Sequence, residues 1–292
     1  MRVAVTGASG FIGGRIARAL AALGHEVQSF GRRPFAQLTN DAPNYVEWDI
    51  TGGRRELTNV DAIVHCAAQV GQWGSDTLFH AVNVGGTQHV VNSSLATARI
   101  VYVSSGSVYH TSHLPAYART KLLGESIVLE SGRPAIILRP HIVYGPGDTT
   151  LWPRVRDARL GTRLQLPGDG NNRVSVTHVD NLVHAVERAL STTHVRGVFD
   201  IADGVVPTMR ELLETMFARH GEAVRIQTVP RSVAWAAAAA LEACWTLLSR
   251  TSDPPLTRYL VQSLADPFRL DIEPARRQLG YAPTHTFLDG PL

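Results

Sequence analysis

A tyrosine and a lysine stand four residues apart in the segment Tyr117-Ala-Arg-Thr-Lys121, and Lys121 is the only lysine of the chain. The apolar spacing of this segment predicts a helix over 117–129. Positions i and i+4 share one face of a helix, so the phenol and the ammonium point into the same space. A neighbouring cation favours phenolate and is expected to lower the pKa of Tyr117. Tyr117 is therefore a candidate general acid and base, with Lys121 as its activator.

Two hydroxyl residues, Ser104 and Ser105, follow the apolar run Val101–Val103. If this run is a strand of a parallel sheet, both serines lie at the edge where ligands bind. Ser105 is then placed to hydrogen-bond a substrate carbonyl. Serine pairs at strand ends also cap turns, and this segment alone leaves the two interpretations equally open.

The segment Thr6–Gly13 carries glycines at positions 7, 10 and 13, after an apolar strand and before an amphipathic helix. Such a turn brings backbone N–H groups and the helix N-terminus against a dinucleotide pyrophosphate. After the second expected strand comes Phe30-Gly31-Arg32-Arg33, with two arginines and no acid. A carboxylate there would bind a ribose hydroxyl, whereas arginine accommodates a 2′-phosphate, so we expect NADP(H) in preference to NAD(H).

Helical and extended patterns alternate in the first half of the chain and predict a Rossmann-type, doubly wound parallel sheet of the α/β class. Strands are expected at 2–6, 26–30, 62–67, 100–104, 135–139 and 197–202, and further helices at 208–220, 231–250 and 274–279. A segment at 174–190 has the pattern of a strand turning into a helix. We expect residues 1–145, with about 174–203, to form the nucleotide domain. Residues 146–173 and 204–292 would form a smaller, partly interleaved substrate lobe.

The composition excludes several classes of protein. The 292 residues are 44% hydrophobic and 18% charged, which is typical of a globular chain. The 27 arginines are scattered and form no basic stripe, so a nucleic-acid partner is not expected. Two cysteines without metal-ligand spacing predict neither a disulfide framework nor a metal site. No signal peptide pattern is present at the first residues, and we expect a reducing, cytoplasmic location.

Taken together, these segments resemble the extended short-chain dehydrogenase/reductase superfamily over nearly the whole chain. The motifs that carry the resemblance are TGxxGxxG at Thr6–Gly13, Asp49-Ile50, the strand end 64–68, 83–87, Ser105 with Val108-Tyr109, Tyr117 with Lys121, 139–147 and 178–181. The resemblance implies an enzyme with Ser105, Tyr117 and Lys121 as catalytic residues. The cofactor contacts, implied by it or inferred above, are Gly7, Ser9, Gly10, Phe11, Ile12, Arg32, Arg33, Asp49, Ile50, Ala67, Ala68, Tyr117, Lys121, Pro140, Ile142 and Val143.

At two places the sequence departs from the motifs of other subgroups of this superfamily, and these departures narrow the choice of subgroup. Gly106-Ser107 stand where sugar-nucleotide dehydratases carry an acidic pair, and Ile142 stands where epimerases place an asparagine. An apolar residue at that position argues for a hydrophobic, uncharged substrate. The ending 275–283 resembles the 3β-hydroxysteroid dehydrogenase-like group, which includes bacterial reductases of β-keto acids. The resemblance also makes a homodimer an expectation.

The loop between Ser105 and Tyr117 is short. Only twelve positions separate Ser105 from Tyr117, and His110 and His113 lie in this short loop. We interpret them as incidental residues of an exposed loop.

The apolar segment 233–248 contains Glu242 and is shorter than the ~20 apolar residues that a membrane span needs. We therefore expect it to form a lid or core helix. Docking of this segment on a lipid surface is left open.

The leading hypothesis is an NADP(H)-dependent oxidoreductase that transfers a hydride between nicotinamide and a carbonyl or hydroxyl of a small hydrophobic substrate. Tyr117 would exchange the proton, and Ser105 would orient the carbonyl. One alternative is an epimerase of a sugar or related polyol, which consumes no cofactor. A second alternative is a non-catalytic regulatory protein that binds NADP.

Overall fold

The computed structural model describes residues 1–38, 41–110, 115–250 and 252–287. At its centre is a sheet of seven strands in the order β10-β6-β5-β4-β1-β2-β3, and every neighbouring pair is parallel. This confirms the predicted Rossmann-type α/β fold. The strands are β1 (Arg2–Thr6), β2 (Glu26–Gly31), β3 (Tyr45–Glu47), β4 (Ala62–His65), β5 (Arg99–Val103), β6 (Ala135–Pro140) and β10 (Gly197–Ile201).

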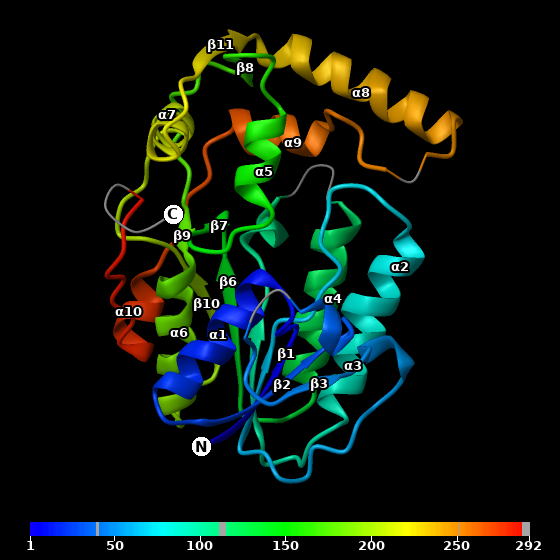
Figure 1. The fold of residues 1–292 in the computed structure, drawn as a ribbon, viewed down its shortest axis with the longest axis vertical. Coiled ribbons are helices and arrows are strands. Elements are labelled where there is room, and N and C mark those ends of the chain that lie inside the picture. Colours follow the sequence, from blue (N-terminus) through cyan, green and yellow to red (C-terminus); the bar gives the residue numbers. More distant parts are fainter. Residues whose placement is uncertain (39–40, 111–114, 251, 288–292) are drawn as a thin grey trace.

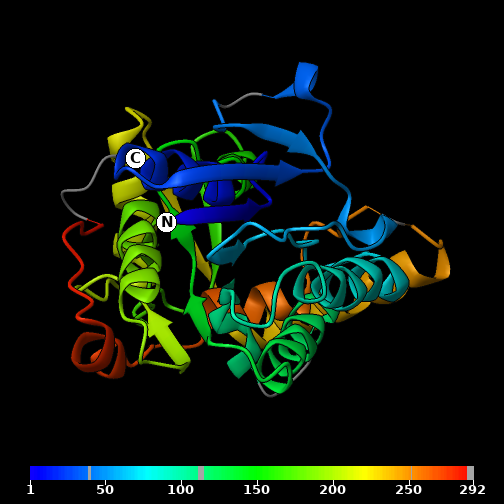
Figure 2. The same ribbon diagram turned by 90° about the horizontal axis from the view of Figure 1, so that it is seen from below.

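Helices cover both faces of the sheet (Figure 1). One face carries α1 (Phe11–Ala22), α6 (Val179–Ser191) and α10 (Glu273–Leu279). The other carries α2 (Asp76–His80), α3 (Gly86–Val91) and α4 (Ala116–Glu130), with a π-helical turn (Ala81–Gly85) joining α2 to α3. Figure 2 shows the two groups of helices on opposite sides of the sheet.

The two faces explain why the central strands carry apolar residues at successive positions. In β5, Val101 and Val103 pack into the cluster under α1 and α6, whereas Ile100 and Tyr102 pack into the cluster under α4. Successive side chains of a strand point to opposite faces, so a sheet covered on both sides needs continuous apolar runs. These runs are what made the strands recognisable in the sequence.

A second group of elements stands above the carboxyl ends of the strands in Figure 1. It contains the parallel pair β8 (Arg163–Pro167) and β11 (Arg225–Val229), and the helices α5 (Leu151–Asp157), α7 (Met209–Arg219), α8 (Arg231–Leu247) and α9 (Arg258–Ala265). A separate apolar cluster, which includes Leu164, Leu166, Leu213 and Phe217, lies between them. Of these elements, only α7 and α8 were expected from the sequence.

The chain returns to the main sheet between these elements. The short pair β7 (Val143–Tyr144) and β9 (Thr177–His178) leads into α6, and β10 then pairs with β6. Asp203 fixes this crossing point, because its buried carboxylate accepts hydrogen bonds from Tyr144 Oη at 2.6 Å, His178 N at 2.8 Å and Asn181 Nδ2 at 2.7 Å. Burial raises the pKa of Asp203 to about 6.

Helix α8 was expected to be a lid or core helix, and it is not a core helix. Ala234 and Ala238 are buried, next to Val261 of α9. Leu247 is 83% exposed, and Val233 is exposed as well. Within the described ranges, no helix combines the length and the apolar character that crossing a bilayer requires.

A buried arginine ties the sheet to α6. Arg99, at the start of β5, is 5% exposed and donates four hydrogen bonds to carbonyl oxygens at and beyond the end of α6. The acceptors are the carbonyls of residues 189, 192, 193 and 195, at 2.7, 2.8, 3.0 and 2.7 Å. A cation at a helix C-terminus also interacts favourably with the helix dipole.

We expect Arg99→Ala to lower the free energy of unfolding by about 3 kcal/mol, because it leaves these buried carbonyls without donors. Urea denaturation followed by circular dichroism measures the change. The exposed Arg54 provides the control, since Arg54→Ala should change stability by less than about 0.5 kcal/mol. Equal stabilities of the two variants would contradict this account of Arg99.

Candidate active site

The residues expected to bind cofactor or substrate fall at one edge of the sheet. They lie in the β1–α1 turn, after β2, β3, β4, β5 and β6, and on α4. All these strands are parallel, so their carboxyl ends share this edge. The strand order reverses between β1 and β4, the point at which open α/β sheets bind ligands.

The β1–α1 turn is built so that only glycine fits. Gly7 has φ +73°, and a Cβ there would lie 2.7 Å from Ala67 N. A Cβ on Gly13 would lie 2.4 Å from the Gly7 carbonyl oxygen. Gly10 is the N-cap of α1 and offers no side-chain cap, and the first turn of the helix has no acidic residue. A helix N-terminus without a carboxylate suits an anionic ligand, so this turn fits a dinucleotide pyrophosphate.

The end of β2 brings Arg33 onto this turn. Arg33 Nη1 donates a hydrogen bond to the Ser9 carbonyl oxygen at 3.2 Å, and Tyr45 Oη donates one to the Arg33 carbonyl oxygen at 2.7 Å. Arg32 and Arg33 are both exposed. The Arg33 guanidinium therefore lies beside the glycine turn and is accessible there, at the end of β2 where dinucleotide-binding sheets hold the adenosine ribose.

The expected adenine side is formed by Asp49 and Ile50, after β3. Ile50 is buried against the sheet, in one cluster with Phe30 and Trp48. The carboxylate of Asp49 accepts hydrogen bonds from Thr51 N at 2.9 Å and from Thr51 Oγ1 at 2.8 Å. Asp49 therefore also caps a short 3₁₀ turn, a structural role that the sequence pattern did not indicate.

Ser105 and Tyr117 meet at the centre of the site. Ser105 follows β5, Tyr117 lies in the first turn of α4, and the Ser105 hydroxyl is close enough to the Tyr117 phenol to affect its pKa. Burial raises the pKa of Tyr117 to about 12, against the lowering effect of the Ser105 hydroxyl. The structure thus brings together two of the three predicted catalytic side chains.

Lys121 lies one turn further along α4 and is 1% exposed. Its Nζ donates a hydrogen bond to the Val103 carbonyl oxygen at 2.7 Å and lies 4.0 Å from the ring centre of Tyr102. Burial lowers the pKa of Lys121 to about 7. The expected lowering of the Tyr117 pKa is therefore wrong, because burial of the phenol raises its pKa, and Lys121, itself buried, is a weaker source of positive charge than a solvated lysine.

Two residues that hold α4 in place, Glu125 and Arg139, were not predicted from the sequence. Glu125, the next residue on the face of Tyr117 and Lys121, is 3% exposed and accepts a hydrogen bond from Ser104 Oγ. Arg139, at the end of β6, donates to both oxygens of Glu125 at 2.9 and 2.5 Å. The i+4 spacing from Lys121 was the sequence signal that places Glu125 on the same helix face, but no local pattern indicates its partner Arg139, which lies on another element.

Asn83, in the π-helical turn, joins α4 to the loop after β4. Its side chain accepts from Gln69 N at 2.8 Å, and donates to the Gln69 carbonyl oxygen at 3.0 Å and to Thr120 Oγ1 at 2.9 Å. This loop also contains Ala67 and Ala68, two of the expected cofactor contacts. The turn is consistent with the tendency of π-helical segments to lie at functional sites.

The interpretation of His110 as an exposed loop residue is wrong. His110 is 7% exposed and packs among aromatic rings, with centroids 5.0 Å away for Phe268 and 5.4 Å away for Tyr259. The sequence could not reveal this, because both partners come from a segment more than 140 residues further along the chain. His113 lies outside the described residues.

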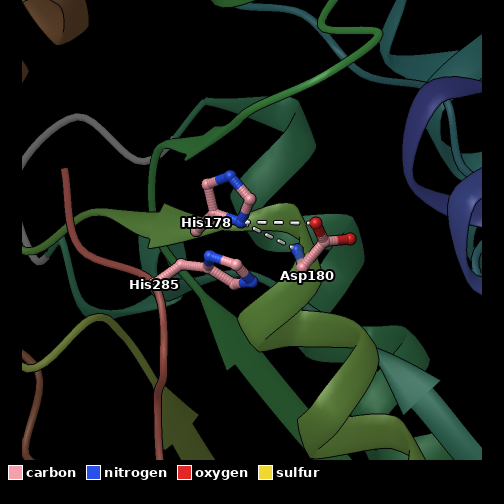
Figure 3. Close-up of side chains that lie close together, drawn as sticks. All are labelled: His178, Asp180 and His285. Carbon is pink, nitrogen blue, oxygen red and sulfur yellow. Dashed lines mark hydrogen bonds and ion pairs between the residues drawn. The ribbon is translucent and has the colours of Figure 1, made fainter. Parts of the chain in front are cut away.

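A second cluster of titratable groups, His178, Asp180 and His285, has its ligand atoms within 4.8 Å of one another (Figure 3). The Asp180 carboxylate is paired with Arg15 of α1 at 2.6 and 2.9 Å. His178 Nδ1 accepts a hydrogen bond from Asp180 N at 3.1 Å and so caps α6. We interpret the cluster as a structural link between α1, α6 and the segment that contains His285.

The fold and this site define a nicotinamide-dinucleotide-dependent enzyme of the extended short-chain dehydrogenase/reductase type. Comparison with known families specifies the assignment. Residues 3–202 match the NAD dependent epimerase/dehydratase family, and the chain belongs to that family.

Proteins similar in sequence to this chain include a reductase and a dehydrogenase. The chain is 33% identical to a 2-alkyl-3-oxoalkanoate reductase of Stenotrophomonas maltophilia (strain K279a), over 99% of this chain and 97% of the relative. It is 32% identical to a 3-beta-hydroxysteroid dehydrogenase of Mycolicibacterium neoaurum, over 63% of this chain and 59% of the relative. Among solved structures, the UDP-glucuronic acid 4-epimerase from Bacillus cereus in complex with NAD matches this chain with a TM-score of 0.74 and 21% sequence identity. The match covers 99% of this chain and 96% of that chain. At this level of identity, the similarity concerns the fold alone.

The buried ammonium of Lys121 gives a prediction about stability. The pKa of Lys121 is about 7 in the folded protein and 10.5 in the unfolded chain. The buried ammonium therefore lowers the free energy of unfolding by its full amount below pH 7. This loss shrinks as the pH rises and disappears above pH 10.5. From pH 6 to pH 10, the unfolding free energy of the wild type should therefore rise relative to that of Lys121→Met by on the order of 4 kcal/mol. Denaturant titrations at several pH values measure this difference.

Arg119→Met, on the exposed side of the same helix, is the control, because arginine stays protonated throughout this range. Its stability difference from the wild type should not depend on pH. A pH-independent difference for Lys121→Met as well would show that the ammonium is not desolvated as described.

Proposed function

We propose that the protein is an NADP(H)-dependent reductase of a ketone on a hydrophobic substrate, with Tyr117 as the general acid. The observation that carries the proposal is the closeness of the Ser105 and Tyr117 hydroxyls, after β5 and at the start of α4, at the edge of the sheet that also holds the glycine turn. It places two donors where one carbonyl oxygen can meet both. The names of the reductase relatives support the same chemistry.

Ser105, Tyr117 and Lys121 have separate roles in the proposed reaction. Ser105 donates a hydrogen bond to the substrate oxygen and orients the carbonyl, and Tyr117 gives its proton to that oxygen as negative charge develops there. Lys121, held by the Val103 carbonyl, stabilises the resulting phenolate when it carries its proton. In the reverse direction, Tyr117 accepts the proton of an alcohol.

The cofactor would be held by the glycine turn, by Arg32 and Arg33, and by the segments at 49–50, 67–68 and 140–143. NADPH bound there supplies the hydride for the carbonyl carbon. We assign residues 1–145 and about 174–203 to cofactor binding, and residues 146–173 and 204–292 to the substrate lobe.

Two features support a hydrophobic substrate. Ile142 is half-buried and packs against the apolar cluster of the second group of elements. A cavity of about 270 Å³ adjoins Ala116, the residue before Tyr117. Its other lining residues are Gln72, Trp73, Gly74, Asp76 and Phe79. Trp73 and Phe79 suit an apolar substituent of the ketone.

We expect Tyr117→Phe to lower kcat for ketone reduction by about 10²–10⁴-fold, because it removes the transferable proton and keeps the ring. NADPH absorbance in a screen of hydrophobic ketones measures turnover. NADPH binding, measured by thermal shift, should change little. Full turnover by this variant would sink the assignment, and product formation without net NADPH consumption would favour an epimerase.

Tyr281→Phe is a matched control, since this phenol is buried away from the site and bonds the Ala202 carbonyl oxygen at 2.9 Å. Its kcat should stay within about twofold of the wild type even if its melting temperature falls, because only a distant hydrogen bond is lost. Loss of activity in both variants would mean that stability, rather than proton transfer, explains the result.

Replacing Arg32 and Arg33 together by alanine should weaken NADPH binding by about ten- to a hundredfold, the effect of losing charge-assisted hydrogen bonds to a phosphate. NADH, which lacks the 2′-phosphate, serves as the internal control and should bind the variant as well as the wild type. Isothermal titration calorimetry gives both dissociation constants. Equal losses for the two cofactors would contradict a 2′-phosphate site.

A further inference from the structure

Helix α8 is apolar on all sides, but the protein covers only one of them. Of its 17 residues 13 are apolar, and the polar ones are Arg231, Ser232, Glu242 and Thr246. The covered side is narrow: its buried residues are Ala234 and Ala238, next to Val261 of α9. A surface helix of a globular protein usually turns polar residues toward water. The outward side of α8 departs from this rule.

The outward side carries an apolar stripe along the whole helix. Leu247 is 83% exposed, Leu248 directly after the helix is 62% exposed, and Val233 is 56% exposed. The other exposed members of this α8 stripe are Ala236, Ala237, Ala240, Ala243 and Cys244. They recur at intervals of three or four residues and so share one side of the helix. Figure 1 shows α8 along the edge of the molecule farthest from the N-terminus, with α9 beneath it.

The charged groups of this segment lie on the side of α9 or at the ends of the helix. Glu242 is the only acidic residue of 231–250, and its carboxylate accepts hydrogen bonds from Arg258 N and Nε, both at 2.7 Å. Arg231 is paired with Asp266, at the end of α9. Arg250, after the other end of α8, is exposed. The α8 stripe is therefore flanked by an accessible positive charge and contains no acid, which complements an anionic surface.

The α8 stripe is too small to hold a second protein chain by itself. A face of 17 residues is about 26 Å long and about 10 Å wide, so it covers roughly 260 Å². A stable protein–protein interface needs about 800 Å² from each partner. Half of the stripe is alanine, which offers none of the aromatic or arginine anchors found at the centre of such interfaces. A lipid surface needs no matching shape and accepts an apolar stripe of this kind.

We propose that the α8 stripe docks in the plane of a lipid bilayer that contains anionic phospholipids. The apolar side chains enter the boundary between headgroups and acyl chains, and Arg250 pairs with a headgroup phosphate. Helix α9 stays on the protein side. Docking is reversible, because one short apolar stripe binds a bilayer only marginally.

The docked helix lies next to the cavity that adjoins Ala116. Trp73 Nε1 donates a hydrogen bond to the Arg250 carbonyl oxygen at 3.2 Å, and Trp73 also lines that cavity. An apolar ketone dissolved in the bilayer then has a short path to the cavity. This consequence rests on the proposed function, whereas the docking itself does not.

The test measures co-sedimentation of the full chain with vesicles of phosphatidylcholine, alone or mixed with about a quarter of phosphatidylglycerol. The wild type should bind the mixed vesicles several-fold more strongly than the neutral ones. Leu247→Gln combined with Leu248→Gln should lower the partition coefficient at least about tenfold on both, because two apolar side chains no longer enter the bilayer. Arg250→Gln should lower it about fivefold on the mixed vesicles and leave it unchanged on the neutral ones.

Leu23→Gln combined with Leu95→Gln is the matched control. These two leucines are 56% and 54% exposed and precede β2 and β5, at the amino edge of the main sheet. The second group of elements stands above the opposite edge. The control should keep its partition coefficient within about twofold of the wild type. Both double variants replace exposed side chains and should fold normally.

Cys244 reports where the chain touches the bilayer. It is exposed within the α8 stripe, whereas burial raises the pKa of Cys66 to about 12 and leaves that thiol unreactive. An environment-sensitive fluorophore on Cys244 should shift its emission to shorter wavelength when mixed vesicles are added. The same fluorophore attached through Leu95→Cys, in a chain that also carries Cys244→Ser, should not shift.

Absence of wild-type binding at millimolar lipid would overturn the proposal. Equal binding by the wild type and the Leu247→Gln, Leu248→Gln variant would do so too, as would an unchanged emission of the Cys244 fluorophore on bound vesicles. Dissociation of a wild-type dimer by the same double substitution, measured by sedimentation velocity without lipid, would assign the stripe to a second copy of the chain instead. None of these readouts uses turnover, so a failure to reduce ketones would overturn the proposed function alone.

Discussion

Burying a single ammonium on α4 constrains most of the active site. Lys121 is shielded from water and must find a buried acceptor, which is the carbonyl of Val103 at the end of β5. That hydrogen bond fixes how far the helix lies along the strand. Tyr117, one turn earlier on the helix, is thereby set against Ser105, two residues after the same strand. The register of one helix on one strand therefore determines the contact between the two proposed catalytic hydroxyls.

Further polar contacts prevent α4 from sliding or rotating. The bidentate pair of Glu125 with Arg139 anchors the helix to β6, and Thr120 is bonded by Asn83. A buried ion pair adds little net stability, because desolvation offsets the attraction, but its geometry is specific. Lys121 destabilises the fold at neutral pH for the same reason. The buried charges of α4 therefore add little to stability or lower it, but their contacts fix the position of Tyr117. Catalysis by a positioned group requires such a fixed geometry.

The sequence predicted the parts of the fold that repeat a local pattern. The apolar runs, the glycine turn and the Tyr117–Lys121 spacing located six of the seven strands of the main sheet and its carboxyl edge, because each pattern lies within one element. Strand β3 was missed, since three residues at a sheet edge show no periodicity. The burial of His110 and the pKa shifts of Tyr117 and Lys121 depend on desolvation by distant segments. No local pattern records such contacts.

The turn after β6 joins the two halves of the site and carries backbone strain. Ile142 has φ +42°, an unusual conformation for a β-branched residue, with a cost of order 1–3 kcal/mol. Its carbonyl accepts a hydrogen bond from Thr177 N at 3.2 Å, and its side chain packs into the second apolar cluster. The residues on either side are His141, whose ring packs against Phe268 and His110, and Val143, one of the expected cofactor contacts. The strained turn therefore holds the carboxyl edge of the main sheet and the second group of elements in one fixed relation, which a relaxed loop would not do.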